Sequence, residues 1–177
     1  MPSRPPDEHY YIDSRTQHVA QGDIFRDIEF RSPEDANLSH TGPGMLLNYT
    51  SGMLVGAEGT NRDYLHRFRV VAPIFALAHI PQLDGRWTHE KVTQLRRDDN
   101  FGGWMYLPPL PPHFEESAVA LFRPVLIAQS QLENERIAQT TEEATRWLER
   151  KLGRVFLGVD VDLEELNPNM SDHWEGA

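Results

Sequence analysis

His89 and Glu90 open a segment, His89-Glu90-Lys91-Val92-Thr93, that begins in the order of a zinc-binding helix. Such a helix needs two imidazoles four residues apart, so that both reach one metal ion from the same face. Thr93 occupies the place of the second histidine. The segment therefore predicts an ordinary helix start, with Glu90 near the N-terminal dipole, and no metal site. The other histidines are scattered, and we expect structural or exposed roles for them: His9, His18, His40, His66, His79, His113 and His173.

Nucleophilic and cofactor chemistry also lack a recognisable motif in this sequence. Ser51 and Ser117 are not flanked by the glycines of a hydrolase elbow. A dinucleotide-binding turn would need a third glycine after Gly42-Pro43-Gly44, where Leu47 stands. The chain has no cysteine, which excludes disulfides, thiolate chemistry and iron–sulfur ligation. We therefore expect no cofactor and no metal.

The size of the chain predicts one domain. Its 177 residues, 39% of them hydrophobic, suffice for a core without cross-links. We expect that domain over residues 21–159, between an extended N-terminal arm (1–20) and an acidic tail (160–177). No apolar run approaches the roughly 20 residues of a membrane span, and the sequence does not start with an apolar leader. A soluble, cytoplasmic protein without a membrane partner is expected.

The net charge of −10 is unevenly distributed along the chain. The tail carries six acidic residues and no lysine or arginine, and the arm contributes −1, which leaves −3 for residues 21–159. A nucleic-acid-binding protein usually displays a clear excess of positive charge. Nucleic acid is therefore a less favoured partner than protein, although a nearly neutral body leaves room for a local basic strip.

Short apolar runs between turn residues predict a set of strands. The first spans about Asp23 to Phe30, with Ile24, Ile28 and Phe30 on one face and Phe25 on the other. Residues 32–44, rich in proline, glycine and polar residues, predict a loop. Pro73 is expected at a strand end, an edge or a bulge, because proline lacks a backbone donor. Further strands are expected over residues 45–50, 68–77, 102–107 and 117–127.

Two helices are expected, over residues 88–96 and from Glu142 to about Leu157. In the second, Thr140 and Glu143 fit a capping box. Its apolar residues recur at helical spacing and need an apolar surface to pack on, for which the open side of a barrel is the expected partner. They are Ala144, Trp147, Leu148, Leu152, Val155 and Phe156.

Three segments together resemble the core of MazF/PemK-type toxins and their non-toxin relatives. They are Gly22-Asp23-Ile24-Phe25, the glycine-led apolar run over residues 44–50, and Val70-Val71-Ala72-Pro73, all within residues 20–78. The nearer resemblance is to an uncharacterised bacterial and phage-borne group, in which Leu107-Pro108-Pro109-Leu110 and a C-terminal helix follow. The resemblance implies an α+β fold: a small, strongly bent antiparallel SH3-like β-barrel with a C-terminal amphipathic helix packed on it.

The toxin's catalytic positions are not matched. The toxins cleave RNA with an arginine at the entry of the second strand and a threonine or serine after the third, where this chain has Gly42-Pro43-Gly44-Met45 and Pro73-Ile74-Phe75-Ala76. A divergent endoribonuclease remains an alternative, with His66 as a base and Arg67 or Arg69 in place of the missing arginine. Otherwise Arg67 and Arg69 are expected to be solvent-facing residues of a strand.

Two segments suggest binding to protein. The stretch from Pro108 to Pro112 is expected to be stiff and extended, so that Pro108, Pro109 and Leu110 could dock in an aromatic groove or serve as a rigid connector. The acidic tail contains Leu163, Leu166 and Trp174, which could anchor it to a partner or to its own body, unless it is a disordered end.

The favoured function is therefore a non-catalytic protein-interaction or regulatory module of a bacterium or mobile genetic element. It would bind a protein, or a second copy as in a homodimer, through the barrel edge or the tail. The alternatives are the divergent endoribonuclease and a structural adaptor of a phage particle.

Overall fold

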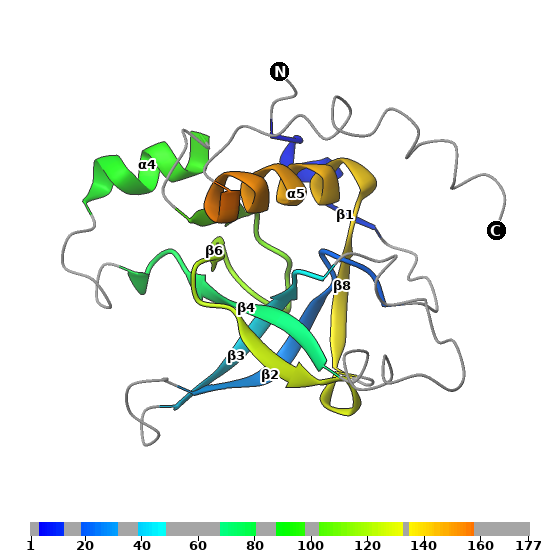
Figure 1. The fold of residues 1–177 in the computed structure, drawn as a ribbon. Coiled ribbons are helices and arrows are strands. Elements are labelled where there is room, and N and C mark those ends of the chain that lie inside the picture. The colour runs from blue at the N-terminus through cyan, green and yellow to red at the C-terminus, as the bar shows by residue number, and fades with distance from the viewer. Residues whose placement is uncertain are drawn as a thin grey trace, which may run out of the picture.

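The computed structural model describes residues 4–12, 19–31, 39–48, 68–80, 88–97, 103–132 and 135–157. Over these residues the protein has eight strands in one antiparallel sheet and two α-helices (Figure 1). The expected α+β class is confirmed at this level. The elements are η1 (Asp7–His9), β1 (Tyr11–Ile12), β2 (Ile24–Arg31), β3 (Ser39–Leu46), β4 (Phe68–Ala76), α4 (His89–Arg97), β5 (Trp104–Leu107), β6 (Ser117–Ala120), β7 (Val125–Ala128), η2 (Gln129–Gln131), β8 (Arg136–Thr140) and α5 (Glu142–Leu157).

β4 is the central strand of the sheet. The strands follow the order β1-β8-β2-β3-β4-β6-β5, and β7 pairs with β4 beside β6. One edge of β4 pairs with β3, and the other pairs first with β7 and then with β6. No pairing joins β2 to β7 among the described residues, so the sheet is open there. A closed barrel is not established.

Pro73 lies inside β4, where the outer edge of that strand changes its partner. Val70 accepts a hydrogen bond from the backbone N–H of Leu47 (2.8 Å), so the backbone groups of Val70 face β3. Because successive residues direct these groups to opposite edges, Pro73 faces the other edge. There the pairing with β7 stops at Val71 and the pairing with β6 starts at Ile74. Pro73 therefore lies where neither β7 nor β6 needs a hydrogen bond from its backbone nitrogen. For this reason β4 can contain a proline.

A β-bulge in β2 changes the faces expected for its side chains. The register with β3 shifts between Phe25 and Ile28, and Asp27 adopts a left-handed φ of 55°. A bulge adds one residue and reverses the alternation beyond it. Ile24 therefore packs in one core cluster, whereas Phe25, Ile28 and Phe30 pack together in another. The prediction that Ile24 shares a face with Ile28 and Phe30 is wrong for this reason.

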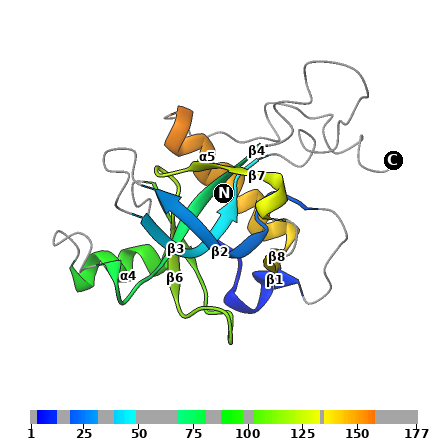
Figure 2. The ribbon, with the colours of Figure 1, turned by 90° about the horizontal axis from the view of Figure 1, so that it is seen from below.

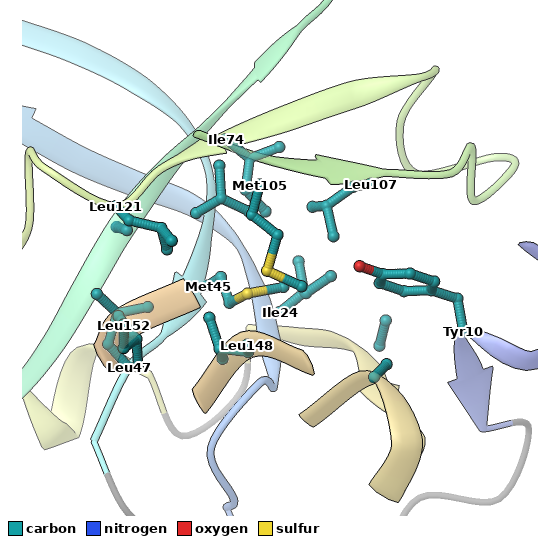
Figure 3. Packing of buried hydrophobic residues seen from close by; sticks show 14 of the residues in the cluster. Tyr10, Ile24, Met45, Leu47, Ile74, Met105, Leu107, Leu121, Leu148 and Leu152 are labelled. Carbon is teal, nitrogen blue, oxygen red and sulfur yellow. The ribbon is translucent and has the colours of Figure 1, made fainter. Parts of the chain in front are cut away.

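α5 covers one face of the sheet. Ala144, Leu148 and Leu152 pack into the cluster that contains Ile24 and Met45, and Figure 3 shows Leu148 directed at these side chains. The bounds expected for this helix are confirmed, but the cap is one residue later than expected, because the hydroxyl of Thr141 accepts the N–H of Ala144 (3.2 Å).

Within the described residues, no helix has both the length and the apolar character needed to cross a bilayer.

Two segments of the sheet differ from the sequence expectation. β3 already begins at Ser39, inside the predicted loop, because residues 39–44 pair with β2 in spite of two glycines. Residues 117–127 form two strands, β6 and β7, separated by a turn at residues 121–123.

α4 is confirmed near its expected position and lies at the opposite end of the molecule from β1 and β8 (Figure 1 and Figure 2).

Residues 4–12, part of the expected arm, are attached to the sheet. β1 pairs with β8, and Tyr10 is fully buried in the main core cluster. The hydroxyl of Tyr10 donates to the carbonyl of Tyr106 (3.1 Å), and that of Tyr11 donates to the carbonyl of Pro108 (2.8 Å). The guanidinium of Arg4 lies 4.1 Å from the centre of the Tyr106 ring. These contacts fasten the segment across the ends of β5 and β8.

Candidate functional site

The Gly22-Asp23 pair that marks the resemblance has a structural task. Gly22 has a φ of 84°, and a Cβ placed there would lie 2.2 Å from Oγ1 of Thr140. Oδ2 of the fully buried Asp23 accepts the N–H of Ala20 (2.9 Å) and a guanidinium hydrogen bond from Arg136 (2.9 Å). Burial raises the pKa of the Asp23 carboxyl above its usual value. The pair therefore ties the start of β2 to β8.

Of the three ribonuclease candidates, the structure describes only Arg69. Its side chain is 6% exposed and donates a hydrogen bond to Oε1 of Gln129 (2.7 Å). The solvent-facing position expected for Arg69 is therefore wrong, because its side chain turns onto the segment that follows β7. His66 and Arg67 lie outside the described residues. The described part of the chain does not bring the three together.

The proline segment turns back on itself between β5 and β6. Leu110 and Phe114 form an isolated β-bridge around a turn at residues 111–113. Pro108 is buried, and Leu110 packs on the main core cluster, which agrees with the rigid-connector reading. Pro109 is exposed at the rim of a depression of about 410 Å³ formed by residues 109 and 111–116. The tail residues Leu163, Leu166 and Trp174 lie outside the described residues.

A row of aromatic rings crosses the sheet on the face opposite α5. Successive ring centres lie 5.3–6.4 Å apart. Small residues on the strands between the rings, Gly42 and Gly44 of β3 and Ala118 of β6, leave space for them. The row is half-buried on average, with Phe122 at 44% exposure. This aromatic row consists of Phe30, His40, Phe75, Trp104 and Phe122.

A second surface, which we call the seam, lies where the sheet is open between β2 and β7. It is a depression of about 320 Å³ with an apolar floor and a polar rim. Leu126 of β7 stands beside it with 70% of its surface exposed, the largest exposure among the large apolar side chains of the described residues. The lining residues are Asp27, Ile28, Glu29, Arg31, Val125, Leu126, Ile127 and Gln131.

The backbone of Leu126 is directed toward the outer edge of β7. Leu126 is opposite Val70, whose backbone groups face β3. In an antiparallel pair, residues opposite each other both direct their backbone groups toward the partner or both direct them away. The N–H and C=O of Leu126 therefore face away from β4, whereas those of Val125 and Ile127 pair with it. An edge of this kind is a template for another strand.

Asp27, Glu29 and Arg31 are the charged residues that line the seam, and Arg26 precedes them on β2. Arg31 binds Glu29 of the same strand (3.1 Å), and Arg26 binds Glu135 (2.7 Å). All four side chains are at least one-third exposed. Exposed ion pairs contribute little net stability, so these partners can be exchanged readily. The seam thus combines an apolar floor, open backbone groups and exchangeable charges.

The described part of the chain contains no arrangement of side chains suited to bind a metal ion. No group of three or more histidine, aspartate or glutamate side chains lies close enough together there. His40, the histidine within the aromatic row, stacks between Phe30 and Phe75. The aromatic row and the seam are therefore suited to contact with another molecule. The row presents aromatic rings, and the seam presents an open strand edge.

Neither the seam nor the aromatic row was predicted from the sequence, because residues 117–127 were expected to form one strand. Phe122 lies in the turn that divides this run, and Leu126 lies on the strand after it. Arg123 and Pro124 at the middle of that run were the available signal for a break. A scan against protein-family models and a search of the curated proteins both found no match for this chain. The candidate site therefore stands on its geometry.

Proposed function

We propose that this protein is a non-catalytic protein-interaction module, and that the seam is its binding surface. The observation that carries the proposal is the open sheet between β2 and β7, where a depression of about 320 Å³ lies beside the exposed Leu126. Native proteins normally cover or charge such an edge. An edge left with an apolar floor is suited to receive a segment of another chain.

In this proposal the bent sheet is an SH3-like barrel that remains open at the seam. The bulge at Asp27, which bends β2, and the two partners on the outer edge of β4 support strong curvature. The resemblance to the MazF/PemK-type barrels supports the same topology. It also supports a bacterial or mobile-element origin, and the absence of cysteine supports a cytoplasmic setting.

The burial of Arg69 favours binding over RNA cleavage. A group that stabilises a phosphorane must reach the substrate, and the guanidinium of Arg69 is instead bonded to Gln129 inside the protein. The distinction can be tested with a mixed-sequence RNA substrate. Cleavage that disappears in both His66→Ala and Arg69→Gln, with folding verified by circular dichroism, would overturn the interaction module.

Peptide display tests the proposal directly. Peptides selected from an unbiased display library on the wild-type protein are measured again on Leu126→Arg and Phe156→Arg. Both substitutions replace an exposed apolar side chain, at the seam and on α5 respectively, so the second is a matched control. The proposal expects binding to be lost in Leu126→Arg and kept in Phe156→Arg. Equal binding to both variants, or no selected peptide at all, contradicts it.

A further inference from the structure

We propose that the seam binds an extended segment of a partner protein in which a lysine or arginine lies between two apolar residues. The inference rests on the proposed function, since it names the chemistry of the partner that the same surface takes. In the bound segment the basic residue pairs with Leu126 of β7, and its two apolar neighbours enter the depression between β2 and β7.

The alternation along β7 determines which side chains of an added strand face the depression. Val125 and Ile127 pack in the cluster of Ile28 and form the floor together with it. Leu126 is directed to the other face, which it shares with its cross-strand partner Val70. A residue that pairs with Leu126 in an antiparallel strand therefore has its side chain beside Leu126. Its two neighbours lie opposite Val125 and Ile127, over the floor, where apolar side chains are favoured.

The backbone of β7 receives such a strand in one register. The N–H and C=O of Leu126 face the outer edge, and one residue of an incoming antiparallel strand can bond to both. Pro124, just before β7, has no N–H to donate. The N–H of Ala128 already donates to Oε1 of Gln131 (3.3 Å). Pairing is therefore centred on Leu126, which places the middle residue of the segment.

The charges that line the depression favour a cation. They comprise two carboxylates, Asp27 and Glu29, and one guanidinium, Arg31, which gives a net charge of −1. Glu29 accepts two hydrogen bonds from Arg31 (3.1 and 3.2 Å), so the cation of Arg31 is already paired. The net charge of −10 on the whole chain attracts a basic segment at longer range as well.

Asp27 is the rim carboxylate whose charge is least compensated. It lies on the bulge of β2 with 71% of its side chain exposed. Among the described residues its one ion-pair partner is Arg26, 3.6 Å away, and Nε of Arg26 is bonded at shorter distance to Glu135 (2.7 Å). A cation brought by a partner can therefore pair with Asp27 without first displacing a close ion pair.

A long basic side chain matches both features of this face. Leu126 has 70% of its surface exposed, and the methylene stem of a lysine or arginine can cover it. The charged end of the same side chain can then reach the rim, where Asp27 and Glu29 lie. A carboxylate in that place would be repelled by both, and a purely apolar side chain would leave Asp27 without the added cation.

The sequences of selected peptides give the first test. Peptides are selected by display on the wild-type protein, and those that lose binding to Leu126→Arg are sequenced. The inference expects an enriched motif of lysine or arginine between two apolar residues. Seam-dependent peptides that lack this motif, or that carry a carboxylate in the middle, overturn the inference and still support the proposed function. If no peptide is selected, both are contradicted.

A double-mutant cycle tests the pairing with Asp27. One selected peptide is compared with a version whose basic residue is replaced by methionine, and calorimetric titration measures both affinities. Wild-type protein is expected to bind the methionine version about two- to fivefold more weakly, which is the range for an exposed ion pair. Asp27→Asn removes the carboxylate and keeps the left-handed φ of 55°, which asparagine tolerates. It is expected to weaken the basic peptide by the same factor and to leave the methionine version unchanged.

Glu142→Gln is the matched control for the loss of one negative charge. Glu142 is an exposed carboxylate of α5, paired with Arg146, and does not line the depression. This variant is expected to bind both peptides as the wild type does, and unchanged thermal unfolding of both variants shows that the fold is intact. Equal losses in Asp27→Asn and Glu142→Gln, or equal binding of the two peptides by the wild type, overturn the inference.

Discussion

The two faces of the sheet are covered to different degrees. Under α5, Leu148 and Met45 are fully buried in a cluster that takes buried residues from six of the eight strands. On the opposite face, Phe122 is 44% exposed at the end of the aromatic row. At the seam, Leu126 is 70% exposed, and its side chain shares the face of its cross-strand partner Val70. The core beneath α5 therefore accounts for stability, whereas the aromatic row and the seam retain apolar surface for contact with another molecule. Substitutions in the core and at the seam should have opposite effects on folding and binding.

The largest expected effect is at the ion pair that ties β2 to β8. Arg136→Met leaves the Asp23 carboxylate buried without its cation, which is expected to lower the free energy of unfolding by about 3–5 kcal/mol at neutral pH. Urea denaturation at a series of pH values measures this loss.

The pH dependence of that loss has a definite sign. Burial already raises the pKa of Asp23, and removing Arg136 raises it further. The destabilisation is therefore small below the unfolded-state pKa, about 4, and grows as the pH rises through the raised folded-state pKa. A loss that is equal at acidic and neutral pH would show that the carboxylate is not the cause.

The next effect belongs to the α5 face. Leu148→Ala removes a fully buried side chain and is expected to cost about 3 kcal/mol of unfolding free energy. Phe156→Ala, on the same helix but 57% exposed, is the control and is expected to cost well under 1 kcal/mol. Chemical denaturation of both variants measures the difference, and equal losses would mean that α5 is not packed by its Leu148 face.

A smaller effect is expected beneath the aromatic row. Gly44→Ala places a methyl group 2.6 Å from Cγ1 of Val71 and 2.8 Å from Cζ of Phe30. Overpacking of this kind costs about 1–3 kcal/mol. Near-ultraviolet circular dichroism and thermal unfolding report it. A neutral result would indicate that the rings are not held as closely on β3 as the structure shows.

The smallest effect on stability is expected at the seam. Leu126→Ser changes an exposed side chain and should alter the unfolding free energy by less than about 0.5 kcal/mol. The same substitution should weaken the binding of seam-directed peptides, because it removes apolar contact. Calorimetric titration with a selected peptide, compared with thermal unfolding, separates the two. A large loss of stability without loss of binding would reverse the roles assigned to the core beneath α5 and to the seam.

The sequence predicted the elements whose patterns are local. α5 is evident from its repeating apolar face, and β2 and β4 from short apolar runs between turn residues. The faces of β2 were not predictable, because the bulge depends on Asp27 accepting a left-handed φ. The sequence predicts β3 too short because its glycines suggest a loop. Their role as space for Phe30 and His40 depends on neighbouring strands.

The candidate site was less predictable than the fold. Where a sheet stays open depends on which strands fail to meet, and pairing between β4 and β7 joins residues more than fifty positions apart in the sequence. The exposure of Leu126 follows from that pairing and from the turn at residues 121–123. The burial of Arg69 likewise depends on Gln129, sixty residues away. Local sequence patterns do not predict such contacts between residues that are distant in the sequence.

Amide hydrogen exchange at Leu126, measured by NMR, tests the central claim most directly. Its N–H is directed to the outer edge of β7, whereas the N–H of Ile127 faces β4. The account predicts that Leu126 exchanges rapidly in dilute protein and becomes protected when a selected peptide occupies the seam, while Ile127 is protected in both states. Exchange at Leu126 that saturating peptide leaves unchanged would contradict the seam as the binding surface.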